Sequence, residues 1–277
     1  MALGVCSIAS GSNGNCYYIG NEHDAILVDA GISCREMEKR MLRLQLSMAR
    51  VKGIFISHEH SDHIYGLMAV AKKYNLPVYS TASTLVKSRI SAHSGISCPL
   101  RVNEEVSIGS LTVTAFSKFH DAVDPCSFIV QCNGTRVGVF TDIGKVCSEV
   151  IRNFKQCNAV FLETNYDETM LLNGNYPRHL KNRISGGQGH LSNVQAFNLF
   201  TQHRSSGLTH LFLAHLSKNN NCPQLVQDTF RQEAGNTKII LASRYAETEL
   251  YHVSATLASL SSLRPQPRTA QLELAFG

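Results

Sequence analysis

One short segment of the chain concentrates side chains that bind divalent metal ions. Residues 58–63 read His-Glu-His-Ser-Asp-His and directly follow the apolar residues 53–57, which predict a β-strand. Imidazole nitrogens and carboxylate oxygens are good ligands for zinc or manganese, and the end of a strand presents them together. A histidine-rich solvated loop is the alternative, but four ligand-type residues at one strand exit favour one or two metal ions.

Similar side chains stand beside other apolar segments. An aspartate ends the segment 24–29, a histidine precedes 128–131, and further residues follow 136–140 and 211–214. The residues in question are Asp29, His120, Asp142 and His215.

The positions of these residues depend on an alternation of short strands and helices. Amphipathic helices are predicted over residues 34–46, 64–74, 193–202 and 223–234. The alternation, in two rough halves, predicts an α/β fold of layered sheets and helices. The predicted strands cover residues 24–29, 53–57, 76–79, 111–114, 128–131, 136–140, 159–162, 211–214, 238–241 and 246–253.

In this order the motifs resemble the metallo-β-lactamase superfamily, whose second motif is His-x-His-x-Asp-His. The resemblance implies a four-layer αββα sandwich with two divalent ions, zinc or manganese, at one edge of the sheets. It makes Asp29 a structural support and Asp62 a catalytic residue as well as a ligand. Two ions about 3.5–4 Å apart can activate water and stabilise both oxygens of a displacement. The resemblance assigns His58, His60 and His120 to one ion, Asp62, His63 and His215 to the other, and Asp142 to both.

Glu163 and His190 are candidates for delivering a proton. Glu163 ends the predicted strand 159–162, and His190 stands where a helix is expected to open. A histidine at a helix N-terminus with a carboxylate nearby can protonate a leaving alkoxide. The pair resembles the one in the nuclease branches of the superfamily, ribonuclease Z and its relatives. The alternatives are that Glu163 is an exposed charge at a strand end and that His190 is an ordinary helix residue. His179 could replace His190 as the acid, but its basic neighbours disfavour its protonated form.

Two segments are candidates for contacts with a nucleic acid. The basic residues Arg178, Lys181 and Arg183 are closely spaced, which suits contacts to phosphates, although a solvated basic loop is the plain alternative. The glycine-rich residues 10–15 include Ser12 and Asn13 and could offer backbone N–H groups to a phosphate or simply form a tight hairpin turn.

Taken with residues 165–167, 176–184, 189–193 and 215–220, the glycine-rich segment closely resembles the bacterial YycJ (WalJ) family. Members of that family are described as metal-dependent 5′→3′ DNA exonucleases, so the resemblance implies this activity, with DNA as partner and a role in DNA replication or repair. Hydrolysis of RNA, or of a small-molecule phosphodiester or thioester by the same metal ions, is the alternative that the residues leave open.

Composition limits the remaining classes of protein. The 277 residues are 43% hydrophobic and 17% charged, which excludes disordered and fibrous proteins, and the net charge of +5 permits a nucleic-acid partner. The chain has no run of 18 apolar residues and no basic, apolar leader, so we expect neither a membrane span nor a secretory signal. Nine scattered cysteines without a Cys-x-x-Cys pair favour the reducing cytoplasm.

Near residue 254 the composition changes to serine, proline and arginine. We therefore expect a catalytic domain over residues 1–253 and a flexible tail over 254–277. The tail ends in a peptide that resembles the Gln-Leu-x-Leu-x-Phe motif with which bacterial proteins bind the DNA-polymerase sliding clamp. A short strand packed on the domain is the alternative. The residues that would bind the clamp are Gln271, Leu272, Leu274 and Phe276.

Overall fold

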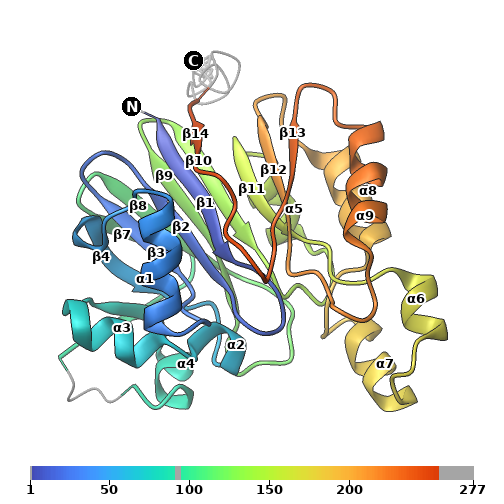
Figure 1. Cartoon of the computed structure of the whole chain (residues 1–277), viewed down its shortest axis with the longest axis horizontal. Coiled ribbons are helices and arrows are strands. Elements are labelled where there is room, and N and C mark those ends of the chain that lie inside the picture. Colours follow the sequence, from blue (N-terminus) through green and yellow to red (C-terminus); the bar gives the residue numbers. More distant parts are fainter. Residues whose placement is uncertain (1, 91–94, 256–277) are drawn as a thin grey trace, which may run out of the picture.

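The computed structural model describes residues 2–90 and 95–255 (Figure 1). The clamp-binding peptide predicted at the C-terminus lies outside these residues, as does nearly all of the predicted tail. No helix in the described part of the chain is both long enough and apolar enough to cross a membrane.

The first sheet contains the N-terminal strands and one strand from the end of the described chain. Its order is β14-β1-β2-β3-β4-β5-β6, with antiparallel pairing from β14 to β3 and parallel pairing from β3 to β6. The strands are β1 (Leu3–Ala9), β2 (Cys16–Gly20), β3 (Ala25–Val28), β4 (Val51–Phe55), β5 (Val78–Thr81), β6 (Ser97–Leu100) and β14 (Tyr251–Val253).

The second sheet repeats this scheme with the remaining strands. Its order is β13-β12-β11-β10-β9-β8-β7, with antiparallel pairing from β7 to β10 and parallel pairing from β10 to β13. The strands are β7 (Glu105–Ile108), β8 (Leu111–Ser117), β9 (Cys126–Cys132), β10 (Thr135–Phe140), β11 (Ala159–Glu163), β12 (His210–Ala214) and β13 (Lys238–Leu241).

Helices cover the outer face of each sheet (Figure 1). Buried side chains of α1, α3 and α4 pack on the first sheet, and those of α5, α8 and α9 pack on the second, which gives four layers. The helices are α1 (Cys34–Arg43), the 3₁₀ helix η1 (Met48–Arg50), α2 (Ser61–Ile64), α3 (Leu67–Tyr74), α4 (Ala82–Lys87), α5 (Ser148–Phe154), α6 (Glu168–Asn173), α7 (Arg178–Ser185), α8 (Asn193–His203) and α9 (Pro223–Gln232).

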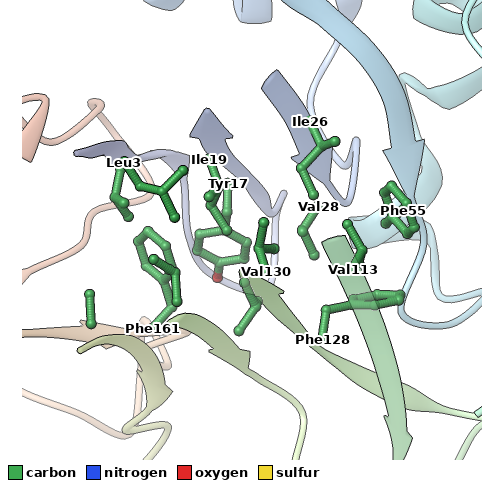
Figure 2. Close-up of a cluster of buried hydrophobic side chains, with 14 of the residues drawn as sticks. Leu3, Tyr17, Ile19, Ile26, Val28, Phe55, Val113, Phe128, Val130 and Phe161 are labelled. Atoms are coloured by element: carbon green, nitrogen blue, oxygen red, sulfur yellow. The ribbon is translucent and has the colours of Figure 1, made fainter. Parts of the chain in front are cut away.

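The central core lies between the two sheets. Successive residues of a strand point to opposite faces, so Phe161 of β11 packs between the sheets while Leu162 packs under the helices. Because both faces of these strands are buried, their sequences are apolar at nearly every position. In Figure 2, Phe161 and Tyr17 face each other across the core, with ring centroids 4.7 Å apart.

These observations confirm the predicted αββα sandwich and correct several element boundaries. The last predicted strand, 246–253, is a strand only from Tyr251 to Val253. The predicted helix 64–74 begins at Leu67, because a separate turn of helix, α2, comes first. The basic segment, for which no helix was predicted, is the helix α7, and the strands β1, β2, β6 and β7 were missed. Short strands at the sheet edges and next to glycine-rich turns carry little alternation by which to find them.

The fold places every candidate ligand at one edge of the sandwich. Parallel strands present their carboxyl ends on the same side, and the segments that follow β3, β4, β8, β10, β11 and β12 all leave the sheets there. In Figure 1 this is the lower edge, which holds α2 and α7.

We predict that removing the Phe161 ring destabilises the whole sandwich. Phe161 is fully buried and also packs on Phe212, with 4.4 Å between the ring centroids. Phe161→Ala should lower the free energy of unfolding by about 3–5 kcal/mol, because the ring leaves a cavity. Leu42→Ala on α1, where the side chain is 76% exposed, is the control and should cost less than about 0.5 kcal/mol. Urea denaturation measures both, and equal midpoints would contradict the prediction.

Candidate metal centre

Three histidines from both sheets converge at the edge of the sandwich. His58 and His60 follow β4 in the first sheet, and His120 follows β8 in the second. His58 Nε2 lies 3.1 Å from His60 Nδ1, which lies 3.3 Å from His120 Nε2. His58 and His120 are buried, and these three nitrogens face one another rather than solvent.

A second group of ligand atoms lies beside the first. Asp62 and His63 belong to α2, and His215 follows β12. Asp62 Oδ2 lies 3.4 Å from His63 Nε2 and 3.7 Å from His215 Nε2.

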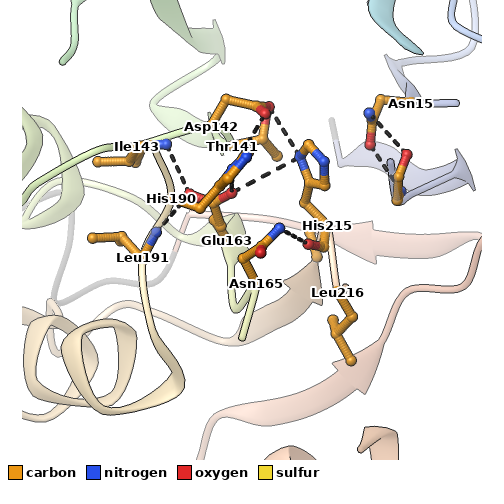
Figure 3. A network of polar contacts seen from close by, with 12 residues as sticks. Asn15, Thr141, Asp142, Ile143, Glu163, Asn165, His190, Leu191, His215 and Leu216 are labelled. Carbon is orange, nitrogen blue, oxygen red and sulfur yellow. Dashed lines mark hydrogen bonds and ion pairs between the residues drawn. The ribbon is translucent and has the colours of Figure 1, made fainter. Parts of the chain in front are cut away.

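Asp142 connects the two groups. Its Oδ2 lies 3.0 Å from His215 Nδ1 and 3.2 Å from His63 Nε2, while its Oδ1 lies 3.8 Å from His120 Nε2. Figure 3 shows this carboxylate turned toward His215. A carboxylate with one oxygen toward each histidine group has the arrangement needed to bridge two metal ions.

Tight turns at the strand ends aim two candidate ligands and the supporting aspartate inward. Asp29, Asp142 and His215 have φ values of 61°, 54° and 55°, in the left-handed region that side chains other than glycine rarely adopt. Such strain is retained where the surrounding structure fixes it and is common at functional sites. Gly31 allows a close approach, because a Cβ there would lie 1.7 Å from the carbonyl oxygen of Asp62.

Burial keeps two of the histidines neutral. Burial lowers the pKa of His58 well below its ordinary range and lowers the pKa of His120 to about 3. A neutral imidazole has a free lone pair, which is the form that binds a metal ion. The opposite nitrogens are already occupied: His120 Nδ1 lies 2.9 Å from the Gly189 carbonyl oxygen, and His58 Nδ1 lies 2.9 Å from Ser57 Oγ.

In the second group, neighbouring charges shift the pKa values more strongly than burial does. Burial alone would lower the pKa of His63, but the carboxylates of Asp142, Asp29 and Asp62 outweigh it and raise that pKa well above its ordinary value. Burial alone would raise the pKa of Asp142, but His215 and His63 outweigh it and hold that pKa well below its ordinary value. The buried anions therefore attract positive charge.

The residues fit divalent metal ions. Nitrogen and oxygen ligand atoms lie within 4.8 Å of one another in each of the two predicted groups and around Asp142. Imidazole and carboxylate are the ligands that zinc and manganese accept, and the hydrogen-bonded outer nitrogens give the second layer of contacts that metal-binding histidines usually have.

Asp29 supports this centre, as its motif predicts. The fully buried carboxylate accepts hydrogen bonds from Ser57 N (2.8 Å) and Ser57 Oγ (3.0 Å), and its Oδ2 lies 2.7 Å from His63 Nδ1. Asp29 thereby fixes the ring orientation of His63 without facing the ligand atoms itself.

Sequence reasoning missed three residues that join the two halves of the centre. Asn15 donates from Nδ2 to Asp62 Oδ2 (3.2 Å), and its backbone N–H donates to the Asp62 carbonyl oxygen (2.8 Å). The Tyr17 hydroxyl donates to Asn15 Oδ1 (3.2 Å) and lies 2.9 Å from Ser10 Oγ, which accepts the backbone N–H of His215 (2.8 Å). The only signal in the sequence is the glycine-rich turn, where Ser10 and Asn15 are buried.

Glu163 and His190 form a hydrogen-bonded pair beside the ligand groups. Glu163 Oε1 lies 2.7 Å from His190 Nδ1, and Oε2 accepts the backbone N–H groups of Ile143 (2.7 Å) and Leu191 (3.1 Å). Figure 3 shows Glu163 at the centre of these contacts. His190 Nδ1 also lies 3.6 Å from Asp142 Oδ1.

One expectation about His190 is wrong. His190 does not open a helix, since α8 begins at Asn193 with Ser192 as its N-cap, so a helix dipole does not explain its position. The carboxylate of Glu163 opposes the effect of burial and raises the pKa of His190. His179, the alternative acid, is exposed on α7.

The candidate nucleic-acid contacts lie near the same edge, but they do not form one cluster. Arg183 of α7 pairs with Asp121, the residue after His120. Lys181 donates to the Leu172 carbonyl oxygen (2.6 Å), and Arg178 is exposed at the start of α7. In the separate β1–β2 turn, Ser12 is exposed and Asn13 Oδ1 accepts a hydrogen bond from Arg244 Nη1 (3.3 Å).

Comparisons with known proteins agree with this arrangement. Residues 24–215 match the family described as the beta-lactamase superfamily domain. Exodeoxyribonuclease YycJ of Bacillus anthracis is 34% identical over 238 residues, which cover 84% of this chain and 89% of that protein. The chain belongs to the YycJ family of the β-lactamase superfamily. It is accordingly a metal-dependent hydrolase.

One further relative agrees with the family, and one solved structure agrees with the fold. Exodeoxyribonuclease WalJ of Streptococcus pneumoniae is 29% identical over 80% of this chain and 84% of that protein. The metallo-β-lactamase-fold protein YhfI of Bacillus subtilis superposes with a TM-score of 0.70 over 91% of this chain and 100% of that chain, at 14% identity. The likeness to YhfI shows the shared fold.

We predict that Asn15 determines how tightly the centre holds metal. Asn15→Ala removes a bond to Asp62 and should weaken metal affinity about 10- to 100-fold, as loss of second-layer contacts usually does. The measurement is competition with a chelating indicator. Asn13→Ala, in the same turn but exposed, is the matched control and should keep the wild-type affinity. Unchanged affinity in a folded Asn15→Ala variant would show that the turn does not support the centre.

Proposed function

We propose that this protein is an exodeoxyribonuclease that degrades DNA from the 5′ end. The observation that carries the proposal is the Glu163–His190 pair, placed beside two metal-ligand groups in a chain of the YycJ family. A hydrolase of phosphodiesters must expel an alkoxide, and this pair supplies a proton donor where that oxygen would form.

The proposed ligand assignment is the one that the motifs imply. His58, His60 and His120 would hold one ion, Asp62, His63 and His215 the other, and Asp142 both. Two zinc or manganese ions held there supply electrophilic stabilisation of the reacting phosphate and make water a better nucleophile. Asp62, at the end of its group and 19% exposed, is the ligand best placed to contact the reacting water.

His190 is proposed as the acid. Its Nδ1 faces Glu163, so its Nε2 is left to donate a proton to the leaving 3′ oxygen. Glu163 has a positioning role, since both of its oxygens are occupied by the imidazole and by two backbone N–H groups. It also stabilises the imidazolium, the form that can give up a proton.

Positive side chains would hold the strand. We place Arg178, Lys181 and Arg183 of α7 on the phosphates of the DNA, with Ser12 and Asn13 of the β1–β2 turn contacting the same strand. The ion pair of Arg183 with Asp121 places this helix next to a metal-ligand loop.

A role in DNA replication or repair, and docking of the C-terminal peptide on the sliding clamp, also belong to the proposal. For the peptide the support is the sequence of Gln271, Leu272, Leu274 and Phe276 alone. A flexible tether would raise the effective concentration of the enzyme at DNA.

The substrate and direction are tested with strands labelled at either end. Metal-reconstituted protein, with manganese or zinc, is incubated with matched single strands of DNA and RNA. We expect stepwise shortening of DNA from the 5′ end. Cleavage of RNA alone would show that the substrate is RNA and not DNA. Cleavage of neither strand by protein that holds its metal would point to a small-molecule hydrolase.

The role of His190 is tested by comparing two leaving groups. His190→Ala should lower kcat on DNA about 10²–10⁴-fold, because the alkoxide loses its proton donor. On a thymidine phosphodiester with 4-nitrophenolate as leaving group, the loss should be far smaller, since this anion leaves without a proton.

His179→Ala is the matched control for that comparison, because this histidine is exposed on α7. It should keep the wild-type kcat on both substrates, and the metal content of all three proteins should agree. Equal losses on both substrates in His190→Ala would assign His190 to metal or substrate binding instead of proton transfer.

A further inference from the structure

A small pocket lies beside the loop that follows His215. It has a volume of about 260 Å³, below the roughly 300–1,000 Å³ typical of pockets for drug-sized ligands. The pocket therefore suits a group smaller than a whole nucleotide. One wall is polar and the rest of the lining is mainly apolar, with Leu216, Pro223, Leu241 and Ala242. The polar wall is formed by Ser10, Ser217, Lys218, Asn221, Ser243 and Arg244.

The pocket and the metal centre share one turn of backbone. Ser10 Oγ accepts the backbone N–H of His215 at 2.8 Å, and Ser10 N donates to the Ser243 carbonyl oxygen at 3.0 Å. Arg244 Nη2 donates to the carbonyl oxygen of Leu216, the residue after His215. The loop that carries His215 therefore also forms part of the pocket wall.

The pocket is positively charged. Lys218 and Arg244 line it, and no aspartate or glutamate does. Within residues 2–90 and 95–255, neither cation forms an ion pair with a carboxylate, whereas Arg40, Arg43 and Arg183 do. Burial lowers the pKa of Arg244, because its guanidinium loses water and gains no carboxylate in return. An anion in the pocket would supply the missing partner.

Arg244 is held in place before any ligand arrives. Asn13 Oδ1 accepts from its Nη1 at 3.3 Å, and the buried Arg40 of α1 donates to the carbonyl oxygens of Arg244 (3.4 Å) and Tyr245 (3.3 Å). Arg40 is itself fixed by Glu36 at 2.9 Å. The guanidinium is therefore preorganised, which lowers the entropic cost of binding an anion.

We infer that this pocket binds the terminal 5′ phosphate of the DNA strand, one nucleotide from the bond that is cut. The inference rests on the proposed exonuclease function. A terminal phosphate carries nearly two negative charges, which two cations match, and it ends the chain, which a small pocket requires. Tyr245, 72% exposed at the rim, offers a ring on which the first base can stack.

The inference predicts a preference for phosphorylated ends. The metal-loaded enzyme should degrade a 5′-phosphorylated strand with a kcat/KM at least about tenfold above that for the same strand with a 5′ hydroxyl, mainly through a lower KM. Lys218→Gln, which changes an exposed side chain, should reduce this ratio about tenfold. Arg244→Gln should also reduce this ratio. The thermal unfolding of this variant is measured as well, because Arg244 also stabilises its own loop.

Lys155→Gln is the matched control, an exposed lysine after α5 at the edge opposite the metal centre, and it should keep the wild-type ratio. Equal degradation of both strands by the wild type would overturn the pocket assignment and leave the exonuclease proposal standing. A preference that survives unchanged in both pocket variants would also overturn it. Failure to degrade either DNA strand would overturn the exonuclease proposal itself.

Discussion

The buried carboxylate of Asp142 is the constraint on which the rest of the edge depends. A charge without a partner in the interior costs several kcal/mol or more, so it must be matched by nearby groups. Its partners come from both sheets: His63 from the first at 3.2 Å and His215 from the second at 3.0 Å. The segments that follow strands of both sheets therefore meet at this anion. His58, His60 and Asp62 stand on the same segment as His63, and His120 reaches the centre from the segment after β8.

Tyr17 makes the core and the metal centre interdependent. Its ring packs on Phe161 in the middle of the sandwich (Figure 2). Its hydroxyl lies between Ser10 and Asn15. Through these partners it reaches a ligand loop of each sheet. A change in the spacing of the sheets would therefore reach the ligand loops through the Tyr17 hydroxyl and its two partners.

The sequence was most informative where chemistry is local. His58 to His63 lie on one strand exit, so their types and spacing predicted the ligands, and apolar strands predicted the sandwich. Asn15 and Ser10 could not be found this way, because their roles come from contacts with Asp62 and His215, which are distant in the chain. Helix α7 was hidden by its charged residues, since only Ile184 of the helix is buried.

Glu163 contacts two different segments of the chain, so substituting it cannot separate the roles of those segments. Glu163 binds the backbone of Ile143, next to Asp142, and of Leu191, next to His190. Replacing it would release a metal-ligand turn and the proposed acid together, so a loss of activity could not be assigned to either. His190 has a narrower set of contacts and 17% of its side chain is exposed, so its removal leaves the turn of Asp142 in place. At His190 the proposed proton transfer can therefore be tested separately from metal binding, whereas at Glu163 it cannot.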